Sequence, residues 1–126
     1  MHGLAARYFG SAIVYAILGM SLGLHMGMSK DHSQMPTHAH LLVIGWVSFA
    51  MFGIFYHLFP SAASSLLAKA QFWLAQVSLI ALVVGLFLIF RGNEAADPIA
   101  GVSSIGLLLS MILFGVVALP VLRGRA

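Results

Sequence analysis

Two histidines stand one residue apart where a long uncharged segment begins, in Pro36-Thr37-His38-Ala39-His40. Ionisable side chains at membrane depth are costly and usually mark a functional site, and histidine is the commonest ligand for metals and a frequent ligand of haem iron. Residues two positions apart point about 200° away from each other on a helix. His38 and His40 are therefore predicted to be ligands that face two different pockets. The alternative is a membrane interface lined with polar side chains.

The other four histidines fit such a site to different degrees. His25 lies near the end of the preceding apolar segment, at about the depth expected for the pair, and is a third candidate ligand. Its alternatives are to hydrogen-bond to a ligating side chain or to extend toward the membrane interface. His2 and His32 are expected to be solvated. His57 follows His40 by seventeen residues, about 25 Å along a helix, so it cannot share their site within one subunit.

The composition excludes a soluble globular domain. Of 126 residues, 61% are hydrophobic and 7% are charged, whereas ordinary domains carry about a quarter charged residues. The six basic residues stand singly, which argues against a nucleic-acid partner. The chain has no cysteine, which excludes disulfides, thiolate-bound metals and covalently attached c-type haem.

Four segments are long and apolar enough to cross the lipid bilayer: 8–28, 36–60, 70–90 and 99–122. The first is longer than the apolar core of a signal peptide and is expected to remain as a span. Short connections between the segments imply antiparallel neighbours. The chain is thus predicted to be an all-α membrane protein, a single domain over 1–126 in which four transmembrane helices run up-down-up-down. A short interfacial helix is expected between Pro60 and Lys69.

Charged residues divide unequally between the two ends of these spans. One side is expected to hold Arg7, Lys69, Arg123 and Arg125, and the other Lys30, Arg91, Asp31, Glu94 and Asp97. The positive-inside rule then places both termini in the cytoplasm of a bacterial-type inner membrane. Under this orientation His25, His32, His38 and His40 lie at the periplasmic side.

Small residues recur every four positions in two of the segments. Gly19-x-x-x-Gly23-x-x-x-Gly27 lies in the first span and Gly106-x-x-x-Ser110 in the fourth. Such ridges let helices approach closely. They are expected to serve either packing within the subunit or contact between subunits.

The stretch from Thr37 to Pro60, which begins His38-Ala39-His40 and continues through Gly45-Trp46, resembles the tenth transmembrane helix of haem–copper oxidase catalytic subunits. The similarity is closest to C-type oxidases and nitric-oxide reductases. In that family the first histidine ligates the high-spin haem and the second ligates the low-spin haem. The resemblance therefore implies b-type haem held by His38 and His40. It covers about 25 residues, and no counterpart of the copper-site helix or the cross-linked tyrosine is recognisable, so whether the chain is an enzyme stays open.

The same resemblance implies an assembly. The oxidase core consists of three arcs of four helices, and the second helix of each arc carries ligands, so this chain resembles one third of a haem–copper oxidase core. A homotrimer would place each haem between subunits, with His38 of one subunit and His40 of the next as axial ligands of low-spin iron. Arg91 occupies the position of the family's propionate-binding arginines; its alternative is to anchor a helix end. The implied function is electron transfer, or redox or gas sensing, with an unknown electron donor or acceptor.

Two other functions compete with haem binding. Residues 20–40 contain four methionines and four histidines, and thioethers with imidazoles suit copper, so a copper-binding membrane protein is one alternative. Methionine is also an ordinary filler of apolar helices. The other alternative is an assembly partner of an oxidase that carries no cofactor.

Overall fold

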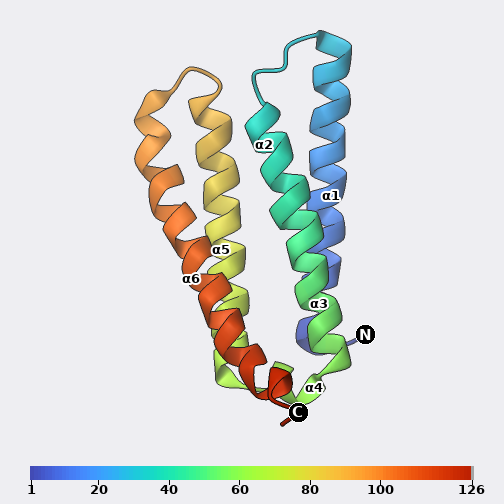
Figure 1. Ribbon diagram of the computed structural model, residues 1–126. Helices are drawn as coiled ribbons and strands as arrows, with labels where there is room; N and C mark the ends of the chain where they lie inside the picture. Colours follow the sequence, from blue (N-terminus) through green and yellow to red (C-terminus); the bar gives the residue numbers. More distant parts are fainter. Residues whose placement is uncertain (126) are drawn as a thin grey trace.

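The computed structural model of the chain describes residues 1–125 and consists of two helical hairpins side by side (Figure 1). The first hairpin joins one long helix to a second span built from three consecutive helical segments, and the second hairpin joins two long helices. The elements are α1 (Gly3–Ser29), α2 (Met35–His40), η1 (Leu41–Ser48), α3 (Phe49–Leu58), α4 (Pro60–Ala63), α5 (Leu66–Ile89), η2 (Glu94–Ala96) and α6 (Asp97–Leu122).

Four helical stretches are long and apolar enough to cross a membrane: Gly3–Ser29, Met35–Leu58, Leu66–Ile89 and Glu94–Leu122. The prediction of an all-α membrane protein is confirmed. Figure 1 shows the four stretches running alternately up and down, with both ends of the chain at the same end of the bundle.

The predicted limits of the first and third spans were too narrow at their basic ends. The first helix begins at Gly3 and the third at Leu66, several residues before the expected starts at 8 and 70. Arg7 and Lys69 therefore lie inside helices, because a long basic side chain near a helix end can extend toward the interface without breaking the backbone hydrogen bonds. The second span ends at Leu58, and the expected short helix follows as α4.

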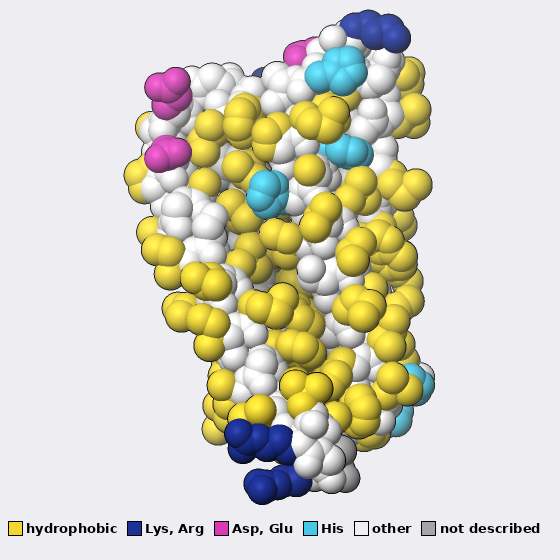
Figure 2. All heavy atoms as spheres, in the orientation of Figure 1, with side chains coloured by type: hydrophobic (Ala, Val, Ile, Leu, Met, Phe, Trp, Pro, Cys, Tyr) yellow, Lys and Arg dark blue, Asp and Glu magenta, His cyan; other side chains and the backbone are white. Residues whose placement is uncertain are grey.

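The two ends of the bundle differ in charge. The end formed by residues 30–34 and 90–97 carries all three acidic side chains of the chain and is called the acidic end. The other end carries Arg7, Lys69, Arg123 and Arg125 and is called the basic end. Figure 2 shows apolar side chains covering most of the face between the two ends, with magenta acidic groups at the acidic end and dark blue basic groups at both ends.

Aromatic side chains fill the core where the hairpins meet. Tyr8 of α1 is completely buried and lies among Phe49, Phe52, Tyr56 and Phe72, with ring centroids 4.8–5.9 Å away. Phe49 and Phe72 meet Tyr8 edge to face and Tyr56 stacks on it, and such ring pairs contribute beyond the area that they bury. The cluster packs α1, α3 and α5 together.

Two buried glutamines on α5 supply acceptors to tyrosines of the first hairpin. Gln71 Oε1 accepts from Tyr8 at 2.6 Å and from Tyr56 at 3.3 Å. Gln76 Oε1 accepts from Tyr15 at 2.7 Å, and its Nε2 donates to Ser11 Oγ at 2.7 Å. Such hydrogen bonds hold helices together in lipid, where water offers no alternative partner.

Candidate functional site

The small-residue ridge of α1 makes room for α2 and the start of η1. A Cβ on Gly19 would lie 2.9 Å from Leu42 Cγ, and one on Gly23 would lie 2.6 Å from Cε1 of His38. Real Cβ atoms do not approach neighbours this closely, so the ring of His38 needs glycine beneath it. Gly27 faces open space. The first two glycines of the ridge therefore pack within the subunit.

His38 is half-buried and is held by a backbone carbonyl of the neighbouring helix. Its Nδ1 lies 2.6 Å from the carbonyl oxygen of Gly19. A carbonyl oxygen only accepts, so Nδ1 is the donor and carries a hydrogen. In the neutral ring the lone pair is then on Nε2, the usual arrangement when a histidine ligates a metal and donates its other N–H to a carbonyl.

His40 is oriented in the same way by a different partner. Its Nδ1 lies 2.7 Å from the carbonyl oxygen of Pro36, one turn earlier in the same helix. That bond again assigns the hydrogen to Nδ1 and leaves Nε2 of the neutral ring as an acceptor. In both neutral rings the hydrogen is thus on Nδ1, and Nε2 is the nitrogen that carries the lone pair.

The pair lies in a regular helical turn, so the two rings leave α2 on opposite sides. His38 and His40 both belong to α2, and His38 faces α1 through its contacts with Gly19 and Gly23. A separation of two residues turns the side chain by about 200°. His38 faces α1, and the helical geometry of α2 directs His40 away from it.

An eight-residue π-helical segment, η1, begins directly after His40. Ser48 Oγ donates to the carbonyl oxygen of Val43, five residues earlier, at 3.2 Å. π-Helical turns are rare and often occur at functional sites. Here the wider turn connects the histidine pair to the aromatic core without a break in the span.

The π segment keeps a strict four-residue repeat on one face. Thr37, Leu41, Gly45 and Phe49 are all buried, although residues four apart drift by about 40° in an α-helix. Wider turns remove that drift. The sequence did not predict this feature, because the burial of positions four apart is seen only once the spans are packed together.

His25 and Arg91, the other two predicted site residues, lie at the acidic end but outside the immediate surroundings of His38. His25 is exposed and lies two residues beyond Gly23 on α1, so it faces away from the glycine surface that holds the ring. Arg91 is exposed just after α5, with its guanidinium carbon 5.6 Å from the centre of the Phe87 ring.

Gln34 joins the histidine-bearing span to the end of α5. Its Nε2 donates to the carbonyl oxygen of Phe87 at 3.0 Å, and its Oε1 accepts from Thr37 at 2.7 Å. No side-chain cap is present at the start of α2, and both polar atoms of Gln34 are used in these two contacts. The same contacts place the start of α2 beside the segment that leads to Arg91.

The remaining histidines are separate from the pair. His32 is exposed in the loop after α1, with Nδ1 3.3 Å from the carbonyl oxygen of Lys30. The neighbouring Asp31 has a lowered pKa, because it accepts a hydrogen bond from the backbone N–H of Ser33. His2 and His57 both lie at the basic end, so His57 does not share a site with His40, as predicted.

Within residues 1–125, no three side chains of histidine, cysteine, aspartate or glutamate lie close enough together to hold a metal ion. Of the four methionines in residues 20–40, Met26 is buried and the others are exposed.

The chain has no match among protein-family models, curated proteins or solved structures. Its function is therefore inferred from the site itself.

Proposed function

We propose that this is an integral membrane protein that binds b-type haem through His38 and His40 and serves electron transfer or redox or gas sensing. The observation that carries the proposal is the shared orientation of the two rings, each donating Nδ1–H to a backbone carbonyl. Such a bond fixes the tautomer and the ring orientation of a metal-ligating histidine. The likeness of residues 37–60 to the haem-binding helix of haem–copper oxidases supports the choice of haem.

Each residue of the site has a defined task in this proposal. His38 and His40 present Nε2 as axial ligands, and Gly23 keeps the space that the ring of His38 needs. Arg91 binds a propionate, a role that suits an exposed guanidinium at the end of a span. When bound, haem supplies one-electron chemistry at iron, and two histidine ligands suit electron transfer.

We further propose a homotrimer in a bacterial-type inner membrane, with both termini in the cytoplasm. The opposed directions of His38 and His40 support an assembly in which one subunit contributes to two haems. The four basic side chains at the basic end support the orientation. If native mass spectrometry detects a monomer that retains full haem, the proposed trimer is wrong, whereas the proposed haem binding still holds.

An absorption spectrum of the purified protein is the first test. A Soret band with sharp, split α and β bands on reduction is expected for haem b with two histidine ligands. Alanine at His38 or at His40 is expected to abolish haem retention, whereas His57→Ala is expected to leave the spectrum unchanged. Full haem and an unchanged spectrum in both single variants would show that the ligands are assigned wrongly.

Copper analysis of the same sample separates the competing functions. Colourless protein that retains copper would favour the copper-binding alternative, with the methionines and histidines of residues 20–40 as the ligands. Colourless protein without copper would favour an assembly partner that carries no cofactor.

A further inference from the structure

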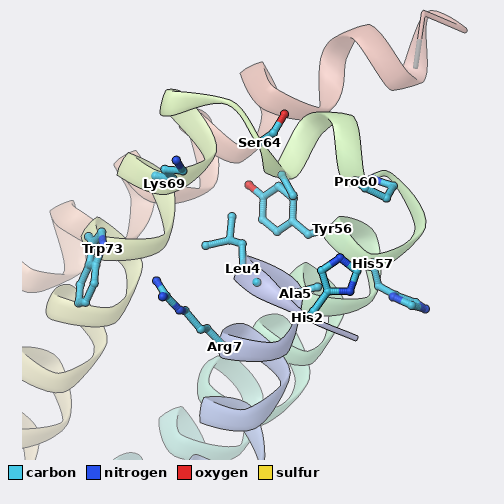
Figure 3. Close-up of a pocket in the computed structure, with 12 residues that line it drawn as sticks. His2, Leu4, Ala5, Arg7, Tyr56, His57, Pro60, Ser64, Lys69 and Trp73 are labelled. Atoms are coloured by element: carbon cyan, nitrogen blue, oxygen red, sulfur yellow. The ribbon is translucent and has the colours of Figure 1, made fainter.

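A pocket of about 520 Å³ opens at the basic end, on the opposite side of the membrane from the histidine pair. The start of α1, the end of α3, the turn through α4 and the start of α5 enclose it. Figure 3 shows Arg7 extending from α1 toward the side where Lys69 and Trp73 of α5 lie. Tyr56 and Leu4 lie between this side and the histidines His2 and His57.

The pocket is positively charged. Arg7 and Lys69 line it, and the three acidic side chains of the chain all lie at the acidic end. The first backbone hydrogen bond of α1 runs from Ala6 N to the carbonyl oxygen of His2, so the amides of residues 3–5 are free of helix partners. These residues also line the pocket, and the positive end of the helix dipole adds to the two side-chain charges.

An apolar path leads from the charged pocket toward the middle of the membrane. Trp73, one turn beyond Lys69, is 60% exposed. Val77, Ile80 and Val84 continue the same face of α5, and all three are exposed. Spacings of three and four residues form one continuous stripe on a helix. Tryptophan at such a boundary is typical of the level where headgroups meet acyl chains.

We propose that this pocket binds the phosphate group of an anionic phospholipid, with an acyl chain along the exposed face of α5. Arg7 and Lys69 contact the phosphate, and Trp73 packs at the junction of headgroup and chain. The combination of two cations, unpaired helix amides and an adjoining apolar stripe suits a phosphate-bearing amphiphile better than a free ion. The proposal is independent of haem binding, because its residues lie at the other end of the bundle.

Native mass spectrometry of the detergent-solubilised protein tests this site. Phosphatidylglycerol and phosphatidylcholine with identical acyl chains are titrated separately, and bound lipid is counted. Phosphatidylglycerol is expected to bind the wild-type protein more tightly. Arg7→Gln or Lys69→Gln should weaken it about fivefold, and the double variant about thirtyfold, as expected when basic residues at an anionic membrane surface are removed.

Arg123→Gln is the matched control, because it removes an exposed charge from the same end outside the pocket. Circular dichroism should give the same helix content for all variants. An equal loss of phosphatidylglycerol affinity in Arg123→Gln and the pocket variants would overturn the site, and so would an unchanged affinity in the double variant. Competition by inorganic phosphate at the concentration of the lipid would instead identify a free-anion site and overturn the lipid as its occupant.

Discussion

The two hairpins share one architecture but differ in where they depart from regular helices. All six histidines belong to the first hairpin, residues 2–57, and the second has none. The second span of the first hairpin changes from α to π geometry directly after His40. In the second hairpin, α5 and α6 are uninterrupted over 24 and 26 residues. The π geometry thus occurs in the span that carries the candidate histidine ligands, whereas the two spans without histidine are regular α-helices.

Close glycine contacts occur in both hairpins, so the same kind of substitution can be made beside a candidate ligand and away from one. In the first hairpin Gly23 contacts the ring of His38, whereas in the second Gly106 contacts Ser78. The first contact positions a candidate ligand, and the second only joins two helices. Matched substitutions should therefore separate an effect on haem from an effect on stability.

Gly23→Ala should have the largest effect on haem. The new methyl group would lie 2.6 Å from Cε1 of His38, and a side-chain ring yields more easily than a backbone. The ring is expected to turn away and lose its 2.6 Å hydrogen bond to the Gly19 carbonyl. Haem content, measured from the Soret absorbance per protein, should fall to the level of His38→Ala, with unchanged helix content.

Gly27→Ala is the control for that substitution. Gly27 belongs to the same ridge, and a Cβ there meets nothing within 4 Å, so haem content should stay at the wild-type level. Equal haem loss in both variants would mean that the ridge acts through contacts between subunits. Normal haem in Gly23→Ala would remove His38 from its assigned role.

Gly106→Ala should destabilise the second hairpin and leave the haem spectrum unchanged. A Cβ at Gly106 would overlap Ser78 Oγ and lie 3.1 Å from Ser78 Cβ, so rotating the serine hydroxyl relieves only part of the clash. Forcing an extra methyl group into a packed site costs about 1–3 kcal/mol. Unfolding in a detergent titration measures this cost. A loss of haem before unfolding would show that the hairpins are coupled at the site.

Gln71→Leu tests the polar contact between the hairpins and should have a smaller effect. It leaves the buried hydroxyls of Tyr8 and Tyr56 without the acceptor that they share. Hydrogen bonds between membrane helices contribute about 0.6 kcal/mol on average, so a loss of about 1 kcal/mol is expected. The buried Nε2 of Gln71 has no partner among residues 1–125, and its removal offsets part of that loss. The same detergent titration provides the measurement, and a more stable variant would contradict the proposed contribution.

The sequence alone predicted the features that depend on composition and spacing. Long apolar runs define the four spans, and the separation of His38 from His40 by two residues predicts their opposed directions on any regular helix. Pro60 and the polar residues after it predict the short helix α4. Each of these properties follows from neighbouring residues and needs no knowledge of distant contacts.

Features that depend on contacts between spans were not predicted. The π segment follows from how Leu41 and Gly45 pack on α1, and the partners of Gln71 lie in other helices, up to 63 positions away in the sequence. The pocket at the basic end likewise combines residues from four elements. The ends of α1 and α5 also differ from the prediction, because a helix can continue past a basic residue whose long side chain reaches the interface.

Arg91→Gln should give the smallest change and shows whether the second hairpin contributes to the site at all. The guanidinium is exposed and stacks on Phe87, so a salt bridge to a propionate is worth at most about 1 kcal/mol, or about fivefold in haem affinity. The rate of haem transfer to excess apomyoglobin measures this change. Lys30→Gln, which removes another exposed charge at the acidic end, is the control. Equal rates of haem loss in the two variants would mean that Arg91 only anchors a helix end and that the first hairpin alone binds haem. Faster haem loss in Arg91→Gln alone would show that both hairpins contribute to haem binding.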